Sequence, residues 1–181
     1  MDNPVVVRVV EVSAALGLAT IRFNFRGVGG STGAYGGGEP EQRDLLAAVA
    51  EIRKRLPDGS PIVVAGYSFG SLVAADVAAA GDVAALALIA PPVGLGDSRR
   101  LPALPPHLPV AVVVGTLDEY CPPEATERLR AELATARVTV IDGANHFFLG
   151  KLFPVGEALR AWLETTLEEL ARQPRRRRGA G

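Results

Sequence analysis

The sequence is poor in the residues that bind metals or form cross-links. Its 181 residues include one cysteine, Cys121, and two histidines, His107 and His146. One cysteine excludes an intramolecular disulfide and a cysteine-based metal site, and no histidine–carboxylate group has the spacing of metal ligands. The sequence therefore implies no metal and no other cofactor, and the single cysteine agrees with a reducing compartment.

Long apolar runs and an excess of positive charge are also lacking. No uncharged apolar run approaches the roughly eighteen residues of a membrane span, and Arg8 and Glu11 interrupt the valines where a signal peptide needs an apolar core. The formal net charge is −1; four arginines gather at positions 175–178, so the rest of the chain carries −5. A weakly acidic body argues against a nucleic-acid partner. We therefore expect a cytoplasmic protein that binds neither nucleic acid nor membrane.

Length and element order predict one α/β domain. With 48% hydrophobic residues, the chain can build one buried core and is too short to make two domains the first expectation. Strand-type and helix-type segments alternate, which is the pattern of a mostly parallel sheet with helices on both faces. We assign the domain to residues 1–172 and a disordered basic tail to residues 173–181.

The expected elements follow from apolar periodicity and from capping and turn residues. Residues 4–16 are rich in valine, a strand former, but Arg8 and Glu11 are three apart and share a face only in a helix. Asn3 is also a good N-cap, so we expect a helix there. The other expected helices are 41–56, 68–80, 124–134 and 155–171. The expected strands are 19–25, 61–67, 84–90, 109–115 and 138–141.

The strongest functional signal is the G-x-S-x-G pattern of residues 66–70, centred on Ser68. A serine at a tight strand-to-helix turn is held in a strained conformation that projects its hydroxyl from the sheet. Side chains two residues to either side would collide there, and glycine has none. The alternative is an ordinary glycine-flanked turn with a surface serine. The strand before the pattern and the helix after it favour a nucleophile.

A serine hydroxyl is a weak nucleophile and needs a general base. His146 follows the last expected strand, where parallel sheets build their sites, whereas His107 precedes a strand and is expected at the opposite edge. A third group must orient the imidazole. Asp118, just after a strand, is favoured for this role, and the adjacent, longer Glu119 is its rival. We therefore expect Ser68, Asp118 and His146 to form a catalytic triad.

Four segments give the chain a resemblance to a known family: residues 23–31, 66–70, 115–118 and 143–148. In this order they resemble the α/β-hydrolase superfamily, and more narrowly the small, lidless bacterial hydrolases related to dienelactone hydrolases and short acyl-esterases. The resemblance implies a serine hydrolase that cleaves an ester-type bond of a small-molecule substrate through an acyl-enzyme. It also implies that the backbone N–H of Phe69 is an oxyanion donor.

The chain departs from this family at its start. Family members have about three strands before the helix expected at residues 4–16, and the loop after the third supplies a second oxyanion amide. That strand would also lie between those expected at 19–25 and 61–67. We interpret Met1 as an internal methionine of a longer natural chain; otherwise the sheet rearranges, or a second copy fills the gap in a homodimer. The departure leaves open a rival function: a catalytically impaired α/β-hydrolase remnant that serves as a binding or interaction module.

Three weaker signals carry no function of their own. Residues 27–33 are glycine-rich after a strand, but Thr32 stands where G-x-G-x-x-G needs its last glycine and no helix follows, so we expect a flexible loop at the edge of the site. Cys121 lies near a helix start, where a thiolate can be stabilised, but no second histidine serves it and we interpret it as structural. Arg99 and Arg100 could bind an acidic substrate group, but we favour the interpretation that they lie in a solvated loop.

Overall fold

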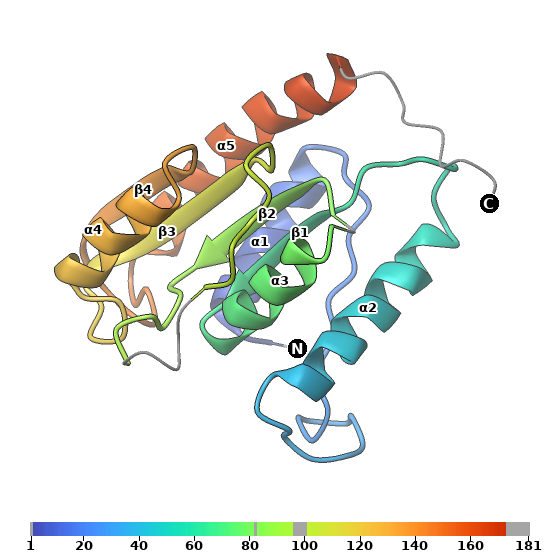
Figure 1. The fold of residues 1–181 in the computed structure, drawn as a ribbon, viewed down its shortest axis with the longest axis horizontal. Coiled ribbons are helices and arrows are strands. Elements are labelled where there is room, and N and C mark those ends of the chain that lie inside the picture. The colour runs from blue at the N-terminus through green and yellow to red at the C-terminus, as the bar shows by residue number, and fades with distance from the viewer. Residues whose placement is uncertain (1, 82, 96–100, 173–181) are drawn as a thin grey trace.

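A computed structural model describes residues 2–81, 83–95 and 101–172 of the chain (Figure 1). The expected tail at 173–181 and the arginines at 99 and 100 lie outside the described residues. The elements in chain order are α1 (Pro4–Ala15), α2 (Glu39–Arg53), β1 (Val63–Tyr67), α3 (Phe69–Ala79), β2 (Ala85–Ile89), β3 (Val110–Leu117), α4 (Pro123–Glu132), β4 (Arg137–Asn145) and α5 (Leu152–Arg172).

The four strands form one parallel sheet in the order β1-β2-β3-β4. Side chains alternate between its two faces, as a pleated strand requires. Leu86 and Leu88 of β2 join a core cluster with residues of α2, α3 and α4, whereas Ala87 and Ile89 join one with residues of α1 and α5. Helices therefore cover both faces, and the expected α/β class is confirmed (Figure 1).

Helix α1 forms where a helix was expected in spite of its valines. The side chain of Asn3 caps it by accepting the backbone N–H groups of Val5 and Val6 at 3.0 and 3.3 Å. Gly17, with φ of +75°, follows its end, and Val5 and Val12 are buried against α5 and the sheet. No helix among the described residues combines the length and apolarity needed to cross a membrane.

The expected strand at 19–25 is wrong. These residues have no regular secondary structure, and residues 19–22 are exposed. Strand-type composition is not sufficient, because a strand needs a neighbour for its backbone hydrogen bonds, and among the described strands β1 pairs only with β2. Phe23 and Phe25 anchor the segment instead, since both pack against the core cluster on the α3 side of the sheet.

Candidate active site

Ser68 lies at the junction of β1 and α3, where the sequence predicts it. Its φ of 52° and ψ of −125° are unusual for a residue with a side chain, and such conformations persist only where the surroundings enforce them. Two backbone hydrogen bonds do so here: the Ser68 N–H donates to the carbonyl of Ile89 at 2.9 Å, and the Ser71 N–H donates to the carbonyl of Ser68 at 2.8 Å. The turn therefore fixes the serine in place.

The two glycines of the G-x-S-x-G pattern do not play equal parts. A Cβ at Gly66 would overlap the backbone of Gly70 and lie 2.6 Å from the Cα of Ser71, so β1 and α3 can approach only because Gly66 has no side chain. A Cβ at Gly70 would make an ordinary 3.6 Å contact with the ring of Phe25. The steric expectation thus holds for Gly66 and is wrong for Gly70.

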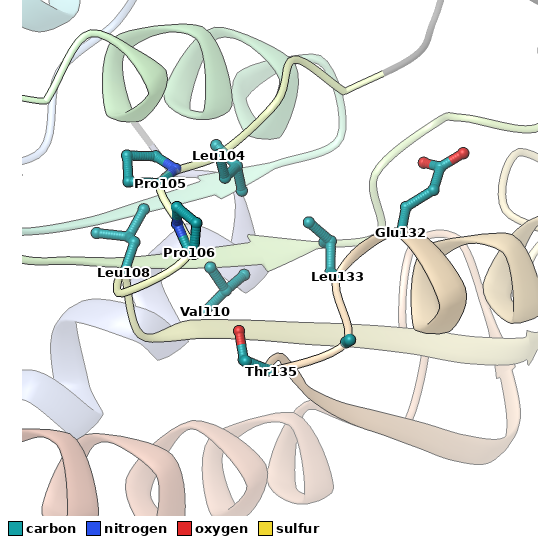
Figure 2. Close-up of a pocket in the computed structure, with 9 residues that line it drawn as sticks. Leu104, Pro105, Pro106, Leu108, Val110, Glu132, Leu133 and Thr135 are labelled. Atoms are coloured by element: carbon teal, nitrogen blue, oxygen red, sulfur yellow. The ribbon is translucent and has the colours of Figure 1, made fainter.

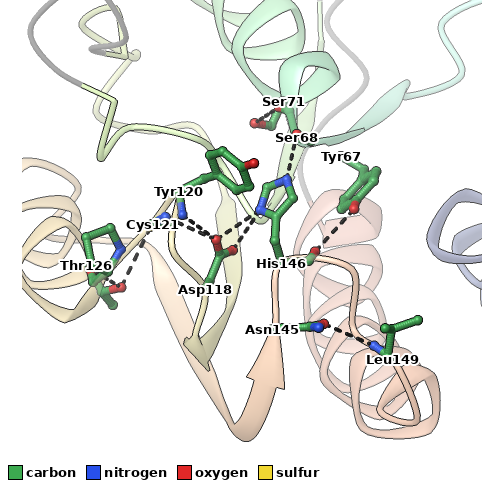
Figure 3. Close-up of polar contacts among 11 residues, drawn as sticks. Tyr67, Ser68, Ser71, Asp118, Tyr120, Cys121, Thr126, Asn145, His146 and Leu149 are labelled. Atoms are coloured by element: carbon green, nitrogen blue, oxygen red, sulfur yellow. Dashed lines mark hydrogen bonds and ion pairs between the residues drawn. The ribbon is translucent and has the colours of Figure 1, made fainter.

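His146 comes directly after β4 and lies between Ser68 and Asp118 (Figure 3). Its Nε2 is 2.8 Å from Ser68 Oγ, and its Nδ1 is 2.9 and 3.0 Å from the two carboxylate oxygens of Asp118. His146 is 4% exposed and Asp118 is 2% exposed. With a proton on Nδ1 donated to the carboxylate, Nε2 is left to accept the serine hydroxyl.

Asp118 follows the end of β3 and is oriented by the backbone as well as by His146. Its Oδ1 accepts the N–H groups of Tyr120 at 2.9 Å and Cys121 at 3.1 Å (Figure 3). Hydrogen bonds of this kind limit the rotation of the carboxylate. The rival Glu119 is exposed. The structure therefore places Asp118, and not Glu119, within hydrogen-bonding distance of His146.

Close approach of β3 and β4 brings Asp118 and His146 together. A Cβ at Gly115 would overlap the carbonyl oxygen of Ala144, and the strand register shifts between Gly115 and Leu117. The Gly143 N–H donates to Thr116 Oγ1 at 2.8 Å across this irregularity. The end of β4 therefore lies closer to β3 than a larger residue at position 115 would allow.

Two tyrosines flank His146, and sequence reasoning did not single out either of them. Tyr120 lies 4.6 Å from the imidazole, centroid to centroid, and Tyr67 lies 5.6 Å from it. The Tyr67 hydroxyl donates to the backbone carbonyl of His146 at 3.2 Å (Figure 3). Burial and the negative charge of Asp118 raise the pKa of Tyr67 to about 12, so the hydroxyl remains a donor at neutral pH.

The remaining candidates lie outside this arrangement. His107 is exposed in the turn before β3, at the opposite edge of the sheet. Cys121 is fully buried, with its Sγ 3.7 Å from Thr126 Oγ1. Burial raises the pKa of the Cys121 thiol to about 11, which leaves it protonated and supports the structural interpretation.

An apolar pocket lies at the start of β3, away from the serine (Figure 2). It is formed by the loop before β3 and the chain after α4, and its one charged residue, Glu132, points away from the apolar side chains. Among the described residues no histidine or cysteine lines it, and the Glu132 carboxylate points away, so it lacks the paired nucleophile and base that covalent cleavage requires. It is lined by Leu104, Pro105, Pro106, Leu108, Val110, Glu132, Leu133, Ala134 and Thr135.

The fold and this side-chain arrangement place the protein in a known class. The model of a family described as an alpha/beta hydrolase domain matches residues 1–171, and the chain belongs to this family. It is similar to an α/β serine hydrolase homologue from Coxiella burnetii, with 36% identity and a TM-score of 0.80 over 89% of this chain and 76% of that chain.

The chain is also similar to two further proteins. A lidless α/β serine hydrolase from Xanthomonas campestris is 33% identical, with a TM-score of 0.79 over 91% of this chain and 74% of that chain. An uncharacterized protein from Rickettsia prowazekii is 28% identical over 173 residues, which cover 91% of this chain and 73% of the relative.

Proposed function

We propose that the protein is a serine hydrolase that cleaves an ester-type bond of a small substrate through an acyl-enzyme. The observation that carries the proposal is the continuous hydrogen-bonded chain from Ser68 Oγ through His146 to Asp118. In the first step, His146 Nε2 takes the hydroxyl proton as Oγ attacks the carbonyl carbon. His146 then gives that proton to the departing alkoxide as the bond to the leaving group breaks.

The second step reverses these roles on water. His146 takes a proton from a water molecule, whose oxygen attacks the acyl-enzyme carbonyl, and the proton returns to Ser68 Oγ as the acid leaves. Asp118 keeps the Nδ1 proton in place and stabilises the imidazolium that forms in each step. None of these steps uses a metal or a cofactor.

The oxyanion of each tetrahedral intermediate needs a hydrogen-bond donor. Phe69 is the first residue of α3, so its N–H is not consumed by the hydrogen bonds of the helix, and the helix dipole favours negative charge there. We assign this N–H as the oxyanion donor.

The rival function is the non-catalytic remnant, an α/β-hydrolase scaffold that binds a partner. The edge of the described sheet favours it, because β1 pairs on one side only and an unpaired edge is a template for another chain. The geometry around Ser68 favours the enzyme, since a remnant has no need of a buried His–Asp pair aligned on a strained serine. Cytoplasmic location, a homodimer and the absence of nucleic-acid and membrane partners stay predictions.

Hydrolysis of p-nitrophenyl esters of increasing acyl length tests the proposal. We expect release of p-nitrophenol that is lost in Ser68→Ala and retained in Ser60→Ala, which removes a hydroxyl from the turn before β1. Short chains should be preferred if the site is lidless, as the Xanthomonas campestris relative is described to be. Equal activity of Ser68→Ala and the unaltered protein would refute the assigned nucleophile.

A further inference from the structure

An exposed aromatic ring contacts the residue that directly follows the proposed nucleophile, and it has no part in the mechanism above. Tyr35, in the loop that precedes α2, is 64% exposed. Its ring centroid is 5.3 Å from that of Phe69, which directly follows Ser68 and supplies the proposed oxyanion donor. The loop joins the lower end of α2 in Figure 1. The Tyr35 ring is therefore in contact with the side chain next to the reacting serine in the chain.

Tyr35 is the outer member of a row of four rings. The centroid distances are 5.0 Å from Phe23 to Phe25 and 5.8 Å from Phe25 to Phe69, and each neighbouring pair meets edge to face. The three phenylalanines are partly buried against the core. Tyr35 alone of the four is largely open to solvent, so the row can accept one more ring at that end.

The loop holds Tyr35 in place from its carboxyl side. Glu41, a fully buried residue of α2, accepts the N–H groups of Gly36 at 2.7 Å and Gly38 at 2.8 Å. Burial opposes ionisation of Glu41, but these N–H donors outweigh it and lower the pKa of the carboxyl below its ordinary value. The charged carboxylate thus fixes the backbone next to Tyr35.

The amino side of the loop is fixed as well. Arg26 binds Asp44 of α2 through Nη2 and Oδ1 at 2.7 Å and through Nε and Oδ2 at 3.0 Å. Gly27, with φ of +72°, packs so closely that a Cβ there would lie 3.1 Å from the Cα of Ala34 and 3.4 Å from the backbone N of Tyr35. A loop that sequence patterns predict to be flexible is therefore anchored on both sides of its exposed ring.

We propose that Tyr35 forms a subsite for an aromatic ring of the substrate, so that the enzyme prefers esters that carry such a ring; this rests on the proposed hydrolase function. A side chain ordered before binding loses little entropy when a ligand arrives. Aromatic pairs gain more than their buried area accounts for, because edge-to-face and offset contacts are favourable. The expected preference over an aliphatic ring of similar size is about two- to tenfold in kcat/KM.

Two matched pairs of esters test this and show which side of the ester bond meets the ring. Ethyl phenylacetate against ethyl cyclohexylacetate probes the acyl side, and benzyl acetate against cyclohexylmethyl acetate probes the alcohol side. The preference for the aromatic member should appear in at least one pair, vanish in Tyr35→Leu and persist in Tyr35→Phe. Val28→Ala, at another exposed apolar residue of the same loop, should leave it unchanged.

The outcomes separate this inference from the proposed function. The subsite is overturned if hydrolysis depends on Ser68 but shows no preference for the aromatic ester. It is also overturned if the preference survives in Tyr35→Leu. In both cases the proposed hydrolase function still holds. If no ester is hydrolysed, dissociation constants of phenylacetate and cyclohexylacetate, measured by NMR titration of the unaltered protein and Tyr35→Leu, decide the matter. Equal dissociation constants of the two acids for the unaltered protein overturn the subsite. Tighter binding of phenylacetate that is lost in Tyr35→Leu supports it.

Discussion

Asp118 is the residue whose role depends most on the surrounding backbone. Its carboxylate accepts hydrogen bonds from the N–H groups of Tyr120 and Cys121 and lies next to His146 Nδ1. An amide in its place has only one acceptor oxygen. Its NH2 group would therefore face an N–H donor or favour the imidazole tautomer without a proton on Nδ1. We predict that Asp118→Asn lowers kcat by about ten-thousand-fold with little change in KM. Glu119→Gln, at the exposed neighbour, is the matched control and should retain full activity. Comparable kcat values for the two variants would show that Asp118 does not orient the base.

Tyr67 supports the histidine loop from the other side. Its hydroxyl donates to the carbonyl of His146, and Tyr67→Phe removes this bond while the ring stays against the imidazole. We predict a several-fold lower kcat, an unchanged KM and a loss of about 1 kcal/mol in the free energy of unfolding. Steady-state kinetics and urea unfolding measure these quantities. An unaltered kcat in a destabilised variant would reduce Tyr67 to a structural residue.

The three residues predicted from the sequence as a triad are also the three that the structure brings within hydrogen-bonding distance. They could be predicted because each follows a strand and carries one of the few chemical groups suited to its role. The contacts of Tyr67 and Tyr120 with His146 could not, because neither tyrosine belongs to a sequence pattern that assigns it a role. No local pattern marks a hydrogen bond to a distant backbone carbonyl.

At the scale of elements, the approach of β3 and β4 depends on Gly115. A methyl group there would overlap the carbonyl oxygen of Ala144, and backbone cannot move aside as a flexible side chain can. We predict that Gly115→Ala lowers the free energy of unfolding by about 1–3 kcal/mol, the usual cost of overpacking, and lowers kcat because Asp118 and His146 separate. Gly30→Ala, where a Cβ meets nothing within 4 Å, should change stability by less than about 0.5 kcal/mol. Equal unfolding midpoints for the two variants would contradict this explanation.

Local sequence features predict an element well where the signal lies within the element itself. Helix α1 was predictable because its cap, its paired charges and its terminal glycine outweigh the strand preference of valine. The segment 19–25 was not, because a strand depends on a partner elsewhere in the chain. The described sheet has β1 at its edge, and composition alone cannot reveal whether a neighbouring strand is present.

At the scale of the whole molecule, stability should fall at alkaline pH. Burial raises the pKa of Cys121 from 9.0 to about 11, so the folded state keeps a proton that the unfolded state releases. A group with a raised folded pKa contributes its full stability below the unfolded pKa and loses it as pH rises through the folded value. Between about pH 8 and pH 10.5 this amounts to about 2 kcal/mol for one such group.

Urea unfolding at these two pH values measures the loss, and Cys121→Ala identifies its source. Over this pH range, the free energy of unfolding of the variant should fall by about 2 kcal/mol less than that of the unaltered protein, whatever the variant's stability at pH 8. Tyr67, whose pKa is raised to about 12, acts in the same direction in both proteins and cancels in the comparison. Identical losses in the two proteins would show that the thiol does not titrate as its burial requires.

The general architecture was predictable because alternating strands and helices leave few arrangements other than a covered parallel sheet. Both faces are covered, and the carboxyl ends of all four strands meet at one edge, where Ser68, Asp118 and His146 converge. Under the proposed function, the choice of ester is assigned to loops such as the one that carries Tyr35. Its conformation depends on tertiary contacts with α2 as well as on its own glycines.

The central claim is that the Ser68 hydroxyl is activated by His146, and a fluorophosphonate probe tests it most directly. Such probes attach covalently to activated serines, so peptide mass spectrometry after labelling identifies the residue that reacted. We predict one adduct, on Ser68, that is lost in Ser68→Ala and strongly slowed in His146→Ala, with Ser60→Ala labelled as fast as the unaltered protein. A folded protein that stays unlabelled, or that labels equally well without His146, would contradict the account.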